Sequence, residues 1–139
     1  MDPNRLIWVA EKAMERAHAP YSNYKVGAAL ICSDGTIFKG CNIENASYGL
    51  TNCAERTALF SAVAAGKTEF AAIAISASGE PDPYPCGACR QVLAEFCGSG
   101  FPIYIKTLEG HESTTLGELL PHAFGSAGDA ASNTPRPSR

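Results

Sequence analysis

Two short apolar segments, Phe70–Ala77 and Pro102–Thr107, constrain the fold of this chain more than any other feature. Each has the length of a buried strand, and the region between them contains a helical segment, Cys86–Cys97. Two strands joined through a helix pair in parallel, and their crossover is right-handed in nearly all known cases. The sequence therefore predicts a βαβ unit with one helix packed on a face of the sheet.

The remaining segments add a hairpin and further helices to this unit. Their apolar residues recur at helical spacing or alternate as in a strand, and turn residues separate them. The expected elements are a helix at residues 4–18, strands at Tyr24–Cys32 and Thr36–Ile43, a helix at Cys53–Ala65 and a short helix at Leu116–Leu120. A hairpin combined with a βαβ unit predicts an α/β domain with a mixed β-sheet and helices on both faces.

The length of 139 residues predicts one domain. The last part of the chain, GSAGDAASNTPRPSR, is small, polar and contains proline, a composition typical of a disordered tail. We therefore expect a folded domain over residues 1–124 and a disordered C-terminal tail over residues 125–139.

Composition argues against several classes of protein. The chain has 11 basic and 14 acidic residues and no basic run, which disfavours nucleic acid as a partner. No apolar run approaches the roughly 20 residues of a membrane span, and the charged N-terminus does not resemble a signal peptide. We therefore expect a cytoplasmic protein, in which the six cysteines are buried apolar residues, metal ligands or nucleophiles.

Cys86 and Cys89 form a C-x-x-C motif at the start of a predicted helix, directly after Pro85. Such a motif is half a zinc site, a redox pair or two unrelated thiols. Cysteines at positions i and i+3 of a helix start point to one side, and the unpaired N–H groups there favour thiolates. The motif alone fits a metal site and a redox pair equally.

Cys53 favours the metal site, because it also begins a predicted helix. Two helix N-termini that meet at one point would bring three thiolates together. Three protein ligands and one open position are typical of catalytic zinc, whereas structural zinc has four ligands. The other cysteines and histidines are poorly placed to be a fourth ligand: Cys32, Cys41, Cys97, His18, His111 and His122.

Glu55 lies two positions after Cys53, and Cys86 lies 31 positions after Glu55. At the irregular first turn of a helix, both side chains can reach one cavity. C-A-E followed by P-C-x-x-C matches the signature of zinc deaminases, in which the glutamate moves protons and does not bind the metal. The alternative interpretation of Glu55 is a surface glutamate or an N-terminal glutamate that the helix dipole favours.

Three thiolates on Zn²⁺ leave a net charge of −1, which weakens the ability of the ion to acidify a bound water. Helix N-termini and a nearby cation would oppose this effect. Arg56 follows the start of the first ligand helix and is the first candidate for that cation. Arg90, directly after Cys89, is the second.

Five segments together resemble the small cytidine deaminases of nucleoside salvage. They are PYSNYKVGAAL, GCNIENASYG, NCAERTALF, PCGACRQVL and LLPHAF, and they span Pro20 to about Phe124. The resemblance implies a three-layer α/β/α fold and one Zn²⁺ per subunit, held by Cys53, Cys86 and Cys89. Family members with three cysteine ligands are usually homotetramers whose active sites are completed by neighbouring subunits.

The resemblance also implies roles in substrate binding. Asn42 and Glu44 match the pair that hydrogen-bonds the ribose hydroxyls, and Ala46 and Tyr48 fall in the same substrate-lining loop.

Two aromatic residues have further implied roles. Tyr24 stands near the pyrimidine, where the family more often has phenylalanine, so its hydroxyl needs a partner. Phe124 matches an aromatic residue that reaches the active site of a neighbouring subunit, although a place in the core is the alternative.

The function implied is zinc-dependent hydrolytic deamination of cytidine and 2'-deoxycytidine to uridine and 2'-deoxyuridine, with release of ammonia. Hydroxide formed at the zinc would attack C4 of the ring. Glu55 would take a proton from water, pass it to N3 and then help protonate the departing amine.

Four other functions remain open at this stage. The nearest is a blasticidin S-type deaminase, against which the segment Asn42–Tyr48 argues. A polynucleotide deaminase needs a basic surface, and the net charge of −3 disfavours it. A non-catalytic zinc module would have a fourth protein ligand, and a redox role for Cys86 and Cys89 would leave Cys53 without a function.

Overall fold

The computed structural model describes residues 1–125 of the chain. Helices and strands alternate in an order close to the expected one. The elements are α1 (Pro3–Met14), β1 (Val26–Cys32), β2 (Ile37–Cys41), η1 (Tyr48–Leu50), α2 (Ala54–Ala64), β3 (Phe70–Ala77), α3 (Gly87–Phe96), β4 (Pro102–Thr107), β5 (Gly110–Thr115) and α4 (Leu116–Leu119).

The five strands form one mixed sheet in the order β2-β1-β3-β4-β5. The pair β3 and β4 is parallel, and α3 connects the two strands as predicted. All other neighbouring strands are antiparallel. The predicted mixed sheet, with its hairpin and its βαβ unit, is therefore confirmed.

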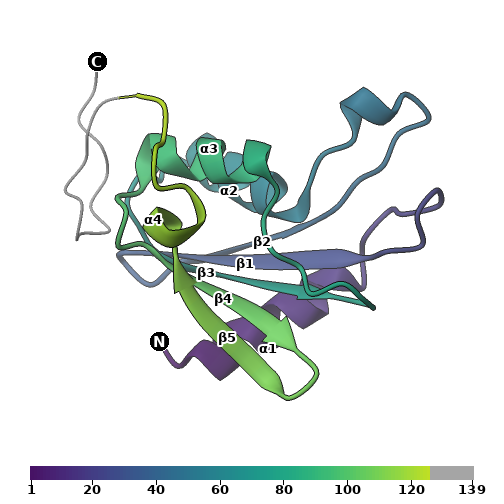
Figure 1. Ribbon diagram of the computed structural model, residues 1–139, viewed down its shortest axis with the longest axis horizontal. Coiled ribbons are helices and arrows are strands. Elements are labelled where there is room, and N and C mark those ends of the chain that lie inside the picture. The colour runs from purple at the N-terminus through teal and green to yellow at the C-terminus, as the bar shows by residue number, and fades with distance from the viewer. Residues whose placement is uncertain (126–139) are drawn as a thin grey trace.

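Helices cover both faces of this sheet, with α2, α3 and α4 on one face and α1 on the other (Figure 1). A larger apolar cluster fills the space below α2 and α3 and includes the fully buried Leu59, Leu93 and Phe101. A smaller cluster joins Leu6 and Ala10 of α1 to the opposite face. The result is the three-layer α/β/α fold that the resemblance implies.

The sheet brings three chain segments to one edge. Because β1 is antiparallel to both β2 and β3, the start of β1 lies beside the ends of its neighbours: Gly27 pairs with Cys41, and Val26 pairs with Ala77. The segments before β1, after β2 and after β3 therefore meet there. The last two lead into α2 and α3, so the N-termini of both helices lie at the same edge.

Gly40 allows α2 to approach the sheet closely. A Cβ atom built on Gly40 would lie 2.3 Å from the carbonyl oxygen of Ala54 and 2.4 Å from the backbone nitrogen of Ala58. No side chain fits at this distance. The absence of a side chain in β2 thus fixes the position of the first turn of α2, which directly follows Cys53.

The first helix is shorter than predicted and ends at Met14 instead of residue 18. The chain after it turns back to the sheet, where the backbone N–H of His18 donates to Asn42 and the carbonyl of His18 accepts from Glu44. These long-range bonds outweigh the helical pattern of residues 15–18. The remaining boundaries differ from the prediction by at most two residues.

The strand β5 was absent from the predicted elements. Its sequence, GHESTT, is polar and lacks the alternation of a half-buried strand. The strand forms because its backbone pairs with β4 over six residue pairs. Its presence does not alter the predicted fold class.

None of the helices within residues 1–125 has the length and apolar character that crossing a bilayer requires. The predicted tail, except for Gly125, lies outside the described residues, so its expected disorder stays a prediction.

Candidate active site

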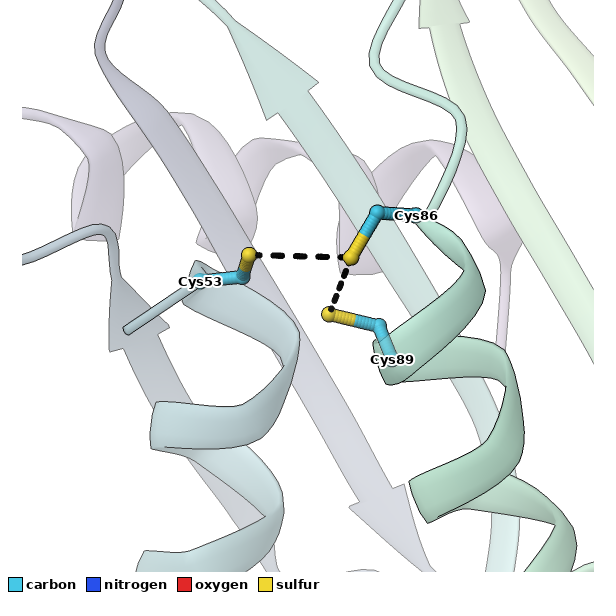
Figure 2. Close-up of side chains that lie close together, drawn as sticks. All are labelled: Cys53, Cys86 and Cys89. Atoms are coloured by element: carbon cyan, nitrogen blue, oxygen red, sulfur yellow. Dashed lines mark hydrogen bonds between the residues drawn. The ribbon is translucent and has the colours of Figure 1, made fainter. Parts of the chain in front are cut away.

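The side chains of Cys53, Cys86 and Cys89 meet between the N-termini of α2 and α3, and their sulfur atoms point toward one another (Figure 2). The sulfur of Cys86 lies 3.8 Å from that of Cys53 and 3.5 Å from that of Cys89. All three sulfur atoms fall within 4.8 Å of one another. This is the one group of candidate metal ligands found within residues 1–125.

The spacing of the sulfur atoms fits a tetrahedral zinc ion. A zinc–sulfur bond of about 2.3 Å places two sulfur ligands of a tetrahedral ion about 3.8 Å apart. The separations from the Cys86 sulfur to the other two, 3.8 Å and 3.5 Å, lie close to this value. The three cysteines could therefore hold zinc and leave its fourth position open, as their spacing in the sequence predicted. None of the other cysteines and histidines expected to be poor ligands joins the group.

Two of the cysteines are N-cap residues, which explains why the sulfur atoms converge. Cys53 caps α2 and Cys86 caps α3, and both have an extended backbone that turns the side chain toward the helix end. Neither side chain accepts a cap hydrogen bond, so the helix N-termini act on the sulfur atoms only through their proximity. Their partial positive charge favours thiolates.

Arg56 supplies a further positive charge at this point. Its Nη2 donates to the sulfur of Cys53 over 3.2 Å. The pKa of Cys53 falls to about 5, mainly because the Cys89 thiol donates to it and also because of Arg56. The Nε of Arg56 is buried without a hydrogen-bond partner among residues 1–125. The side chain as a whole is only partly buried, and its contact with Cys53 places a positive charge against the candidate thiolates.

Arg90, the second candidate cation, makes different contacts. Its guanidinium donates to the carbonyl oxygens of Pro85 over 2.7 Å and of Leu119 over 2.8 Å. These bonds fasten the residue before Cys86 to the end of α4. Arg90 thus holds the backbone that carries the ligand pair, a contact that the sequence did not indicate.

Glu55 is buried beside the three cysteines, with 5% of its surface exposed. Burial raises the pKa of its carboxyl group to about 7, and the nearby Cys53 thiolate acts in the same direction. A carboxylic acid with this pKa can gain and lose a proton near neutral pH. The interpretation of Glu55 as a surface residue is therefore wrong.

Asn42 is buried at the shared edge of the sheet. Its Oδ1 accepts from the backbone N–H of Val26 over 2.9 Å, and its Nδ2 donates to the carbonyl oxygen of Tyr24 over 2.8 Å. These bonds leave one amide proton and one lone pair for another partner. Hydrogen bonds to Tyr24 and Val26 at the start of β1 thus hold the side chain in place, and Asn42 is not a surface residue.

Glu44 accepts three hydrogen bonds from the segment before β1. The donors are the backbone N–H of Tyr21 at 2.9 Å, the N–H of Ser22 at 3.2 Å and the Ser22 hydroxyl at 2.5 Å. These bonds, led by the Ser22 hydroxyl, lower the pKa of Glu44 and keep it ionised. Sequence reasoning did not single out Ser22, and its position in PYSNY was the only signal.

Tyr48 and Glu44 line a cavity of about 360 Å³ together with Tyr21, Ser22 and Thr51. The segment that contains η1 projects away from the sheet (Figure 1). Tyr48 is 74% exposed, and Ala46 is also exposed.

A larger hollow of about 860 Å³ lies between the segment Glu80–Asp82 and the turn between β4 and β5. Neither hollow is lined by any of the three cysteines, so the cysteine cluster and not a cavity volume identifies the site.

In the sequence, Tyr24 precedes the three cysteines and Phe124 follows them. The hydroxyl of Tyr24 donates to the carbonyl oxygen of Pro81 over 2.5 Å, which supplies the partner it needs. Phe124 is 76% exposed, and the side-chain amide of Gln91 bonds its backbone N–H and carbonyl. The alternative interpretation of Phe124 as a core residue is therefore wrong.

Comparison with known proteins supports this interpretation of the site. Residues 2–104 match the family described as the cytidine and deoxycytidylate deaminase zinc-binding region. The chain belongs to this family. The match extends over most of the described residues and includes the three cysteines. It confirms the resemblance and the zinc cofactor, and it makes the chain an enzyme of the cytidine deaminase family.

Relatives of similar length belong to the same family. A cytidine deaminase of Sporosarcina psychrophila is 54% identical over 89% of this chain and 92% of its own length. One from Halalkalibacterium halodurans is 52% identical over 89% of this chain and 95% of its own.

Solved structures of cytidine deaminases share the fold. The enzyme from Burkholderia pseudomallei has a TM-score of 0.84 at 53% identity and covers 89% of this chain and all of its own. The enzyme from Mycobacterium tuberculosis has a TM-score of 0.80 at 41% identity, with 90% of this chain and 98% of its own covered. These likenesses confirm the predicted fold class.

Proposed function

We propose that this protein catalyses the hydrolytic deamination of cytidine and 2'-deoxycytidine to uridine and 2'-deoxyuridine, with release of ammonia. One observation carries the proposal: three cysteine sulfur atoms with the spacing of zinc ligands lie beside a buried glutamate whose pKa is about 7. A structural zinc site has no use for that glutamate. The catalytic unit corresponds to residues 1–124.

Cys53, Cys86 and Cys89 would hold the zinc ion. When bound at a site with an open position, zinc acidifies water and so supplies a nucleophile at neutral pH. Arg56 and the two helix N-termini offset the charge of the three thiolates. They keep the cluster from becoming too negative to acidify water.

Glu55 moves the protons of the reaction. Its carboxylate accepts a proton from the attacking water and donates it to N3 of the ring, which makes C4 electrophilic. Glu55 then takes the second proton of the former water from the new hydroxyl on C4 and passes it to the amine, which leaves as ammonia when the C4–N bond breaks. Burial holds the pKa of Glu55 at about 7, so the group serves as base and as acid at neutral pH.

Asn42 and Glu44 bind the ribose hydroxyls in this proposal. Glu44 is ionised and fixed by Ser22, and the buried Asn42 has one donor and one acceptor left for a ligand. Ala46 and Tyr48 line the same side of the nucleoside. The aromatic ring of Tyr24 lies near the pyrimidine.

The active enzyme is a homotetramer in this proposal, and Phe124 reaches the site of a neighbouring subunit. Its support is the exposure of groups that belong to the proposed site: Cys86 is exposed, and Tyr48 and Phe124 are 74% and 76% exposed. Neighbouring chains would cover them. The cytoplasm, where thiolate ligands stay reduced, is the proposed location.

Ultraviolet absorbance tests the proposed function, because it distinguishes cytosine from uracil. We expect zinc-loaded protein to convert cytidine and deoxycytidine, and a chelator to abolish turnover. Blasticidin S and a short single-stranded oligonucleotide serve as alternative substrates. Faster turnover of either alternative, or full activity after removal of zinc, would contradict the proposal.

A further inference from the structure

The hydroxyl group of Tyr24 joins two segments that are far apart in sequence. It donates a hydrogen bond of 2.5 Å to the carbonyl oxygen of Pro81. Tyr24 precedes β1, whereas Pro81 belongs to segment 78–85, which leads directly to Cys86. The bond therefore connects the start of β1 to the chain that carries two of the three candidate zinc ligands.

Segment 78–85 is held at both ends by other bonds. At its start, the N–H of Ser78 donates to the carbonyl of Lys25 over 2.8 Å, and the Ser78 hydroxyl accepts from the N–H of Lys25 over 3.0 Å. At its end, Arg90 bonds the carbonyl of Pro85. Between these ends, the Tyr24 hydroxyl fastens Pro81 to the start of β1, and the Tyr84 hydroxyl donates to the carboxylate of Glu112 in β5.

The backbone of Tyr24 contacts the other side of the site. Its carbonyl oxygen accepts from the side-chain amide of Asn42 over 2.8 Å. Asn42 is buried, and the adjacent N–H of Val26 donates to it. One residue thus bridges the proposed ribose-binding segment, through its carbonyl, and the segment before Cys86, through its hydroxyl.

We propose that Tyr24 is a positioning residue whose hydroxyl holds segment 78–85 against the start of β1 and thereby tightens nucleoside binding. This inference rests on the proposed function. Phenylalanine at this position would keep the ring and its packing but would lose the bond to Pro81. The segment would then have to be ordered when substrate binds, which weakens binding and leaves the chemical step unchanged.

The variant Tyr24→Phe tests this inference, with Tyr104→Phe as the matched control. Tyr104 is a β4 residue packed on the face of the sheet that α1 covers. We expect amide exchange in peptides covering residues 78–85 to be faster in zinc-loaded Tyr24→Phe and unchanged in the control. We also expect KM for cytidine to rise about three- to tenfold, the loss of one neutral hydrogen bond, with kcat within about twofold.

Two results would overturn the inference. One is unchanged exchange in residues 78–85, because the segment would then be held without the hydroxyl. The other is faster exchange with unchanged KM, because the bond would then be irrelevant to binding. Wild-type protein that fails to turn over cytidine would contradict the proposed function instead, and the exchange comparison would still test the bond itself.

Discussion

At the scale of single residues, Glu55 and Cys53 show how two positions at one helix start acquire opposite properties. Cys53 is the N-cap residue of α2, and the nearby Cys89 thiol and the Arg56 guanidinium lower the pKa of its thiol. Glu55 is the second residue of α2 and is buried, which raises the pKa of its carboxyl group. The N-terminus of one helix therefore presents a thiolate ligand beside a carboxylic acid that can exchange protons at neutral pH.

The exchange of Glu44 for glutamine tests its role in binding. We expect Glu44→Gln to raise KM for cytidine about tenfold and to change kcat by less than about twofold, because a charge-assisted hydrogen bond to the ribose is lost from ground state and transition state alike. Steady-state kinetics measure both constants. Glu95→Gln, an exposed position late in α3, is the control. An unchanged KM with a collapsed kcat would refute the assigned role.

The residues of the site were predictable from sequence to different degrees. The shared site of the three cysteines and Glu55 was predictable, because a helix start fixes where its side chains point. The contacts of Glu44 with Ser22 and of Arg90 with Pro85 were not, because they depend on how distant segments meet in space. No periodicity or spacing in the sequence encodes such pairs.

At the scale of helices and strands, close packing between β2 and α2 sets the position of the site. The carbonyl of Ala54 and the backbone nitrogen of Ala58 lie where a Cβ atom of residue 40 would be. The first turn of α2 therefore lies directly against β2, and this contact sets the position of Cys53 and Glu55.

The variant Gly40→Ala should therefore push α2 away from the sheet. We expect it to lower the free energy of unfolding by about 3 kcal/mol, the upper range for overpacking, and to weaken zinc binding in the protein that remains folded. Thermal unfolding and metal analysis measure the two effects. Gly79→Ala is the control, because nothing lies within 4 Å of a Cβ atom there. Equal stability of the two variants would show that the contact is unimportant.

Apolar strands and helices were predictable as elements, whereas β5 was not. Most residues of Phe70–Ala77 are buried, and Pro102–Thr107 buries Ile103 and Ile105, so the apolar composition of these segments reveals them. The polar β5 exists because it completes the hydrogen bonds of β4. The end of α1 was misjudged for a related reason, since residues after Met14 bond to the chain around Asn42 instead of continuing the helix.

At the scale of the whole molecule, the topology explains why the site lies at one edge of the sheet. Antiparallel pairing of β1 with β2 and β3 collects three connecting segments there, and α2 and α3 begin at the same edge. The predicted α/β class followed from the order of elements alone. The exposure of Tyr48 and Phe124 has no explanation within a single chain.

A mixture of two inactive variants tests whether subunits share active sites. We expect Phe124→Ala and Glu55→Gln to be impaired when made alone. Co-expression should restore activity above the sum of the two, because a site with Glu55 from one chain can receive Phe124 from the other. Deamination of cytidine by the purified mixed oligomer measures the recovery. A single-chain active site predicts activity equal to that sum and would exclude sharing.

The central claim is that the cysteine cluster binds a catalytic zinc and that Glu55 moves the protons. Zinc content and cytidine turnover, measured together on Glu55→Gln, test it most directly. We expect one zinc ion per chain, as in wild type, and a loss of turnover of at least about 10²-fold, the smallest usual contribution of a general acid–base group. Near-normal turnover in the zinc-replete variant would contradict it.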